Sequence, residues 1–453
     1  MKFILTTLLV LAFPLMVKCQ IKMLSIDSLY LQGVSKFYQF AETTKDEIWP
    51  GMELSPVCLY RVDGPAILYN HPNPPASFKK IDEKTHFGLQ NELNLFGATQ
   101  VKINGVLTAI VNYGLEHYSR PEEVYAELFH EVHHVFQRNS IKNIESDNPA
   151  ILLNYPEDIN NDAIKLFEQQ LLLKMAFTND KNQFNKYLNQ FYSSRIKRGN
   201  IIGEKYIKYE KTVENFEGPA YYCEYRFYNS YSSHGKTLKE NYSNKHFWSI
   251  LNTPYYGRNN LRLRHLASGL AMCYILDRFI SDDWKNEYYS GNTDLFDFFV
   301  LKFKPHVVDL PDFDVFYSLS DYHTTRLILQ REQDYELFLN KSGIKVILEF
   351  ESTPQFRGFD PMSSKAINDS IILHSSYLSL NNKDNSLFVK NNEVATIINQ
   401  QIWFVSKVIF FLERESDLII NGEKIIISKA GLDLKWEGKI IADEKNKIKI
   451  KLK

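Results

Sequence analysis

The chain has 453 residues, of which 44% are hydrophobic and 24% charged, and its formal net charge is −1 at pH 7. This balance of charge gives no electrostatic reason to expect nucleic acid or an acidic membrane surface as a partner. The length suffices for two or three domains with substantial cores.

The N-terminus carries an apolar run, residues 3–17, that follows Lys2 and is too short to span a bilayer. It has the form of a secretory signal peptide, so we expect residues 1–19 to be cleaved and the protein to be secreted or periplasmic. Lipidation of Cys19 is the alternative, but Lys18 stands where a lipidated cysteine is preceded by a small residue. No later run of about twenty apolar residues occurs, so we predict no transmembrane segment.

Three cysteines, Cys58, Cys223 and Cys273, remain after that cleavage. So small and odd a number is not typical of a disulfide scaffold. Cys223 and Cys273 form either a pair or two buried thiols, and the sequence leaves both readings open.

Residues 24–43 have a helical pattern, and short apolar strands follow it. The strands form two pairs, each around a turn signal: 56–62 with 66–70 around Asp63-Gly64, and 101–103 with 106–113 around Asn104-Gly105. The last strand is a candidate for a sheet edge along which an extended peptide lies, an ordinary edge being the alternative.

From residue 159 to 228 the pattern is helical, with breaks near Gly199 and Gly203. A long polar loop is predicted over 229–259. Further helices are expected at 260–280 and 322–341.

Beyond Gly343 the composition changes to strand-like runs. The predicted strands are 344–350, 370–373, 402–412, 418–420, 425–427 and 448–452. We therefore predict an α+β protein with a mainly helical domain that carries a small N-terminal sheet over 20–343. A β-rich C-terminal domain, read as a sandwich, follows over 344–453.

Within the first domain, His130, Glu131 and His134 form the pattern H-E-x-x-H. Residues four apart lie on the same face of a helix, so both imidazoles can bind one zinc ion. Glu131 lies beside them, where a carboxylate can accept a proton from zinc-bound water.

A helix is supported here by a capping box, Ser119 with Glu122, and by Pro121 in the first turn. An apolar stripe runs along one side: Val124, Leu128, Val132, Val135 and Phe136. The two histidines point away from this stripe, toward an expected cleft. His133 lies to one side, so we interpret it as supporting the site rather than as a ligand.

The alternative interpretation is a surface helix with solvated or hydrogen-bonded histidines. A catalytic zinc site needs three protein ligands and one open position. The motif therefore requires a third ligand elsewhere in the chain.

The helix after Gly203 carries Glu217-Gly218-Pro219-Ala220-Tyr221-Tyr222-Cys223-Glu224, which has the form E-G-x-A-x-Y-x-E. Together with H-E-x-x-H, this string resembles the gluzincin metallopeptidases, the aminopeptidase-N-like and thermolysin-like group. The resemblance covers about residues 100 to 285. It implies a zincin-like catalytic domain in which Glu217 is the third zinc ligand. Glu224 is the fallback ligand, and Glu214 follows it.

The chain departs from the family in two respects. The spacing from His134 to Glu217 is longer than in the best-known aminopeptidases, which leaves the subfamily open. Pro219 denies its N–H to the carbonyl of Asn215, so we expect the helix to kink or restart near Glu217.

The resemblance implies an exported zinc-dependent peptidase, divergent within its group, that hydrolyses peptide bonds with a zinc-bound water. Glu131 is the general base, and the partner is a peptide or protein substrate. Candidates for the group that stabilises the oxyanion are Tyr255, Tyr256, His234 and His265. The alternative function is a catalytically inactive zincin-like binding or surface protein.

Overall fold

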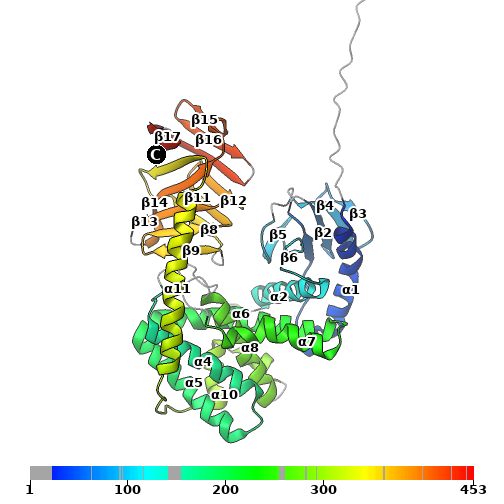
Figure 1. The fold of residues 1–453 in the computed structure, drawn as a ribbon. Helices are drawn as coiled ribbons and strands as arrows, with labels where there is room; N and C mark the ends of the chain where they lie inside the picture. The colour runs from blue at the N-terminus through cyan, green and yellow to red at the C-terminus, as the bar shows by residue number, and fades with distance from the viewer. Residues whose placement is uncertain are drawn as a thin grey trace, which may run out of the picture. The chain divides into compact units, whose positions relative to one another are not determined.

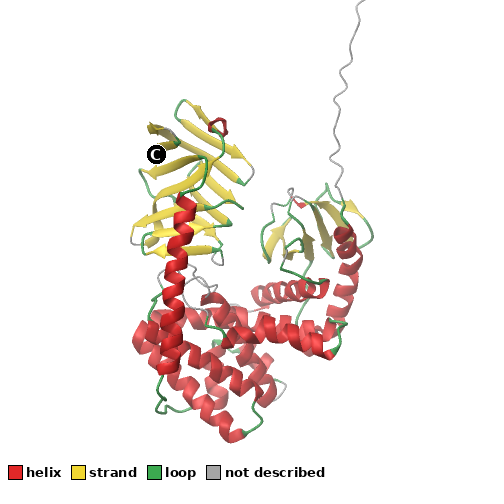
Figure 2. Cartoon of the chain, viewed as in Figure 1, coloured by secondary structure: helices red, strands yellow, loops and turns green. Residues whose placement is uncertain are grey.

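The computed structural model describes residues 23–62, 64–90, 93, 95–115, 117–140, 151, 155–254, 261–280, 283–291, 293–360, 363–399, 401–429, 431–444 and 446–453. The predicted signal peptide, with Cys19, lies outside these residues. Helices and sheets are both present, with a small N-terminal sheet and a β-rich C-terminal region (Figure 2). The chain divides into two compact units, residues 1–45 with 52–136 and residues 46–51 with 137–453.

The elements are labelled in Figure 1. The first unit contains most of α1 (Ser25–Ile48), β1 (Val57–Tyr60), β2 (Pro65–Tyr69), β3 (Lys79–Lys80), β4 (Thr85–Leu89), β5 (Thr99–Ile103), β6 (Val106–Asn112) and most of α2 (Pro121–Ser140). The helices of the second unit are α4 (Ile159–Phe177), α5 (Lys181–Ile202), α6 (Glu204–Tyr231), α7 (Lys236–Ser243), η2 (Asn244–Trp248), η3 (Ser249–Asn252), α8 (Leu261–Phe279), α9 (Trp284–Ser290), α10 (Leu295–Phe303) and α11 (Asp314–Leu339).

The sheet of the first unit has the strand order β3-β4-β2-β1-β6-β5. Both predicted hairpins are confirmed, since β1 pairs antiparallel with β2 and β5 with β6. Asn104 and Gly105 have φ values of 44° and 85°, as a type I′ turn requires. Because β6 also pairs with β1, the prediction that it forms the sheet edge is wrong. β5 is the last strand of the order instead.

Aromatic rings join α1 to α2 within the first unit. Tyr125 of α2 stacks on Phe37 with centroids 5.2 Å apart, and its edge meets Tyr30 at 5.8 Å. Gly33 lies under the same ring, where a Cβ atom would come 2.2 Å from the Tyr125 hydroxyl oxygen. These contacts hold α2, and hence its histidines, against α1.

In the second unit, α6 and α8 cross at two glycines. A Cβ atom on Gly218 would lie 2.6 Å from the Cα of Gly269, and one on Gly269 would lie 2.8 Å from the carbonyl oxygen of Glu214. Only glycine allows two helix backbones to come this close.

Pro219 lies inside α6, which nevertheless runs continuously from Glu204 to Tyr231. The expected restart near Glu217 is therefore wrong, and a kink at this point stays a prediction. The Tyr288 hydroxyl of α9 donates to the side-chain Oδ1 of Asn215 and lies 3.4 Å from the backbone carbonyl oxygen that Pro219 cannot serve. A polar group of α9 therefore lies beside this carbonyl, where α6 continues without a break.

A buried network of charged groups connects α4, α5, α6 and α8. Arg195 donates to Glu168 at 2.6 Å and to Glu214 at 2.9 Å, and Lys165 lies 3.3 Å from Glu168. Further members are Arg198 with Glu210, Arg264 with Asp162, and Ser268 and His265 with Glu214. Ion pairs of this kind hold together only when each charge has its partner, because an unpaired buried charge is strongly destabilising.

Two expectations about residues 220–280 are settled by this unit. The predicted polar loop over 229–259 is wrong over its middle part, which forms α7, η2 and η3. Phe247 and Trp248 are buried there and stabilise these short helices by packing. The high proportion of polar residues in the segment led to the prediction of a loop. Cys223 and Cys273 are both free, buried thiols rather than a disulfide.

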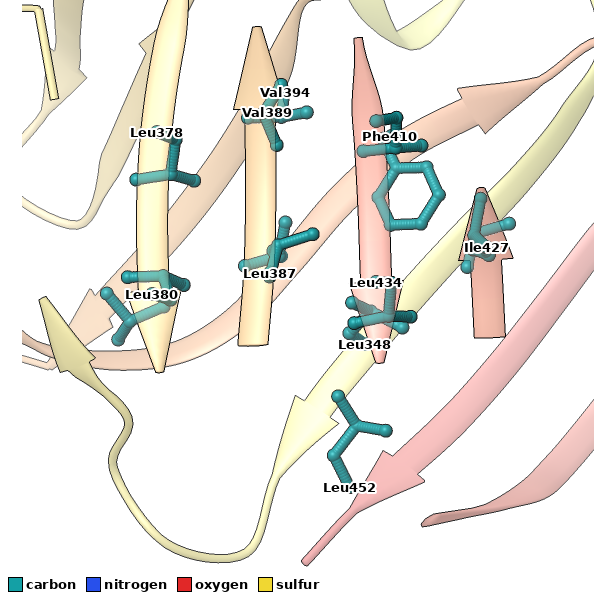
Figure 3. Packing of buried hydrophobic residues seen from close by; sticks show 14 of the residues in the cluster. Leu348, Leu378, Leu380, Leu387, Val389, Val394, Phe410, Ile427, Leu434 and Leu452 are labelled. Atoms are coloured by element: carbon teal, nitrogen blue, oxygen red, sulfur yellow. The ribbon is translucent and has the colours of Figure 1, made fainter. Parts of the chain in front are cut away.

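Strands occupy the chain after Gly343, and their bounds are β7 (Ile344–Phe350), β8 (Gln355–Phe359), β9 (Ser364–Asn368), β10 (Ile371–His374), β11 (Tyr377–Asn382), β12 (Asn385–Lys390), β13 (Val394–Asn399), β14 (Gln401–Leu412), β15 (Leu418–Asn421), β16 (Lys424–Lys429), β17 (Leu432–Glu444) and β18 (Lys447–Leu452). Their order is β8-β11-β12-β17-β18-β7-β14-β13-β10-β9, with β16 attached to β17 and β15 to β16. The long strand β17 pairs with β12 through its first half and with β18 through its second. Leu348, Leu380 and Leu434, from both halves of this path, belong to one apolar core (Figure 3).

We expect Gly269→Ala to destabilise the protein by about 3 kcal/mol, because the added methyl group overlaps the backbone of α6 and neither helix can yield cheaply. Thermal unfolding of the purified protein measures this effect. Gly235→Ala is the matched control, since a Cβ atom there meets nothing within 4 Å. Equal unfolding midpoints for the two variants would contradict the close crossing of α6 and α8.

Acid should weaken the buried network through His265. Burial, together with the charge of Lys165, lowers the pKa of His265 to about 4. The unfolded chain therefore binds a proton below pH 6.5 that the folded chain does not bind until about pH 4, so stability falls as the pH is lowered through this window. His265→Gln should flatten the decline of the unfolding midpoint between pH 6.5 and 4.5. The exposed His306→Gln should leave that slope unchanged.

Candidate metal centre

The centre begins with two imidazoles on consecutive turns of α2. The Nε2 atoms of His130 and His134 are 3.0 Å apart, and the two residues are 6% and 2% exposed. Two nitrogens bound to one tetrahedral zinc ion at its usual bond length are separated by roughly 3.3 Å. The pair therefore has the separation that a shared metal ion needs.

The start of α2 was predicted correctly in position but not in its capping residue. The helix begins at Pro121, and the carboxylate that accepts from the Ser119 backbone N–H, at 2.7 Å, belongs to Glu123 rather than Glu122. The predicted apolar stripe is buried, but so is the histidine face, since Glu131 is only 6% exposed. The expectation that α2 has one face in the core and the histidine face open to solvent is therefore wrong for the histidine face.

His133 is fully buried, and its ring lies 5.9 Å from that of Phe136. Burial, with the neighbouring charges of His134 and His130, lowers its pKa well below the usual value. A neutral, packed imidazole fits the supporting role that the sequence predicts for it.

Glu131 lies between the two histidines in sequence, and its Oε2 atom accepts a hydrogen bond from the side-chain amide of Gln100 on β5. Nothing in the local sequence around Gln100 marks it as part of a site, because the contact joins a strand to a helix 31 residues away. Only the pairing of β5 beside β6 brings this amide to the carboxylate.

Glu217 lies on α6, one residue before the close crossing with α8. Its carboxylate and the nitrogens of His130 and His134 offer one ligand atom each, and these atoms all lie within 4.8 Å of one another. Among the described residues, this buried group is the one that can hold a metal ion. The three residues predicted as ligands are therefore brought together.

Gln137 lies on α2 three residues after His134, so the two residues belong to the same turn of the helix. Gln137 donates from its side chain to the carbonyl oxygen of Phe216 at 3.0 Å. This bond ties α2 to the residue that precedes Glu217.

Glu217 also forms an ion pair with Arg262, in the first turn of α8. Sequence reasoning missed this arginine as well as Gln137. An arginine 45 residues away from a carboxylate is not distinguished by any local pattern. The donor set of two imidazoles and one carboxylate fits zinc, with Arg262 as a competing cation for one carboxylate oxygen.

The two fallback ligands have other partners. The Oε1 atom of Glu224 lies 3.0 Å from Nε2 of His246. Glu214 belongs to the buried network with Arg195, and its Oε1 accepts from Ser268 at 2.8 Å. Neither belongs to the group that includes Glu217.

Of the four candidates for the group that stabilises the oxyanion, the structure describes two. Tyr255 and Tyr256 lie outside the described residues. His265 is fully buried and its Nδ1 lies 3.3 Å from Glu214, which removes it from the groups that can touch a substrate. His234 follows α6, and its backbone N–H donates to the Ser232 hydroxyl at 3.3 Å. Its role as a donor stays a prediction.

Comparison with known proteins adds no assignment: no family model matches the chain, and neither the curated proteins nor the solved structures yield a match. No helix in the described part of the chain combines the length and apolar character needed to cross a bilayer.

We expect Glu217→Ala to lose stoichiometric zinc, because only two imidazole ligands remain on α2. Glu224→Ala is the matched control, being a glutamate of the same helix with a different partner, and it should keep its zinc. Metal content per chain, measured after dialysis against trace zinc, checks both. Full zinc in Glu217→Ala, or its loss from Glu224→Ala alone, would move the third ligand away from Glu217.

Proposed function

We propose that this protein is an exported, zinc-dependent peptidase of the gluzincin type, with a zincin-like catalytic domain over residues 20–343. The observation that carries the proposal is the convergence of His130, His134 and Glu217 within 4.8 Å, with Glu131 next to the first of them. This combines three ligands of the right chemistry with a carboxylate suited to proton transfer.

In the proposed reaction, His130, His134 and Glu217 hold the metal ion. A bound zinc ion lowers the pKa of its water toward ~7 and polarises the carbonyl group of the substrate. Glu131 takes the proton of the attacking water and passes it to the leaving amine. Both steps need the carboxylate of Glu131 to keep one orientation, which its burial and its bond to Gln100 favour.

The peptide substrate is proposed to pair with β5, the last strand of the first sheet. In a two-residue hairpin the closing pair, here Ile103 with Val106, exchanges hydrogen bonds, and the next pair does not. Lys102 belongs to that next pair, so its N–H and C=O point away from β6. Backbone groups of this kind bind an extended peptide with little regard to its side chains.

Export rests on the apolar segment before residue 20 alone. N-terminal sequencing of the protein recovered from the medium or periplasm tests it, and the mature chain should begin at Gln20.

A second function is favoured by one observation, the ion pair between Arg262 and Glu217. A cation that holds the third ligand competes with metal binding, which suits a catalytically inactive zincin-like binding protein. The two functions differ in one result. Zinc-loaded protein that cleaves no member of a broad peptide library would support the inactive relative.

We expect Glu131→Gln to reduce turnover of a peptide substrate by at least about a hundredfold while zinc content stays at the wild-type level. Glutamine preserves the size of the side chain but cannot accept the proton. Cleavage of a peptide library, followed by mass spectrometry, together with metal analysis of the same preparation measures both quantities.

Glu122→Gln provides the control, because it makes the same chemical change in the first turn of the same helix. This variant should keep both zinc and turnover. Wild-type turnover in Glu131→Gln would rule out Glu131 as the general base.

A further inference from the structure

The side-chain amide of Gln100, on β5, donates a hydrogen bond to Oε2 of Glu131, on α2. An ionised carboxylate can only accept hydrogen bonds, whereas a glutamine amide carries two N–H donors. The chemistry of the pair is therefore matched, and the donor brings no charge of its own.

Both residues of this hydrogen bond belong to regular secondary structure, Gln100 to a strand and Glu131 to a helix. Gln100 lies within β5 opposite Ala109 of β6, which in turn pairs with Val57 of β1. Ala109 is fully buried and small, so the side chain beside Gln100 on that face of the sheet leaves it room to extend. Glu131 lies in the middle of α2. The distance between the two groups is thus fixed by a sheet and a helix rather than by loops.

A glutamate side chain has three torsions, and a carboxylate used for proton transfer must point at its target. A bond to Oε2 fixes the rotation of the carboxylate group and therefore the direction of Oε1. Displacements of about 1 Å in a catalytic group can reduce the rate a hundredfold. Hydrogen-bond partners that orient the ligands of a metal site typically contribute 10- to 100-fold to affinity or activity, and we expect an effect of similar size for a partner that orients the base.

We propose that Gln100 is a positioning residue, whose side-chain amide holds the Glu131 carboxylate in the orientation needed for proton transfer. The inference rests on the proposed peptidase function and adds to it a residue of β5 that no motif includes. It also assigns β5 a second task, because the strand proposed to bind the substrate also orients the base.

The test compares Gln100→Ala and Gln100→Met with wild type. Methionine keeps the volume of glutamine and removes its donor, so it separates packing from hydrogen bonding. Both variants should lower kcat by about 10- to 100-fold. KM should stay within about twofold and zinc per chain at the wild-type value, because the side-chain amide of Gln100 donates to the carboxylate of Glu131, which is not a proposed metal ligand.

Gln39→Ala is the matched control, since Gln39 is an exposed glutamine on α1 of the same unit. It should leave kcat, KM and zinc content unchanged. Wild-type kcat in Gln100→Met would overturn the proposal in favour of a packing role. Loss of zinc in parallel with activity in both Gln100 variants would overturn it in favour of a structural role.

A readout that needs no turnover completes the test. If Gln100 acts on Glu131, the shifts in unfolding midpoint of Gln100→Ala and Glu131→Ala should be non-additive in the double variant. Additive shifts would overturn the pairing itself. Zinc-loaded wild type without peptidase activity would overturn both the proposed function and this role. Active wild type with fully active Gln100 variants would overturn the positioning role alone.

Discussion

The position of Glu217 depends on the close crossing of α6 and α8. Gly218 and Gly269 bring the two backbones into direct contact, which leaves α6 little freedom to rotate or slide at the residue next to Glu217. One turn earlier, Glu214 is held by Arg195 in the buried network. The carbonyl oxygen of Phe216 accepts from Gln137 of α2. Contacts with three different elements thus define the direction of a single carboxylate.

The polar groups of the centre are buried, and burial explains why the carboxylates of Glu131 and Glu217 each have a hydrogen-bond or ion-pair partner. A buried acid without a donor is destabilising, so a fold that buries such groups must pair them. Glu217 faces a cation, Arg262, and Glu131 faces a neutral amide, Gln100. The partners differ in charge as the proposed roles differ, since a ligand must remain an anion and a base must accept and release a proton.

The helical part of the second unit also pairs buried carboxylates with donors, and it does so with more charged groups. The charges of Arg195, Lys165 and Arg198 outweigh the effect of burial and lower the pKa of Glu168 to about 2. The pKa values of Glu210 and Glu214 are lowered as well, so these three glutamates are ionised across the physiological range. They connect the helices by directional bonds, which specify one relative arrangement of α4, α5, α6 and α8 where apolar contacts alone would allow several.

The sequence by itself determined the features that a few neighbouring residues encode. Helical periodicity placed His130 and His134 on one face, turn chemistry located both hairpins, and the string after Gly203 identified Glu217. The alternation of strand residues after Gly343 also indicated a β-rich region. The helix face, the hairpins and the strands follow from backbone geometry within a short segment, which operates before any tertiary contact forms, whereas Glu217 was picked out by its resemblance to a family motif.

Only the tertiary structure decided which distant groups meet. Gln100 and Arg262 carry no local signal, because they reach the centre through strand order and helix packing respectively. The same reason explains the error over 229–259, where buried aromatic residues stabilise short helices in a polar segment. Long-range packing overrides local propensity wherever it buries enough surface or satisfies a backbone group.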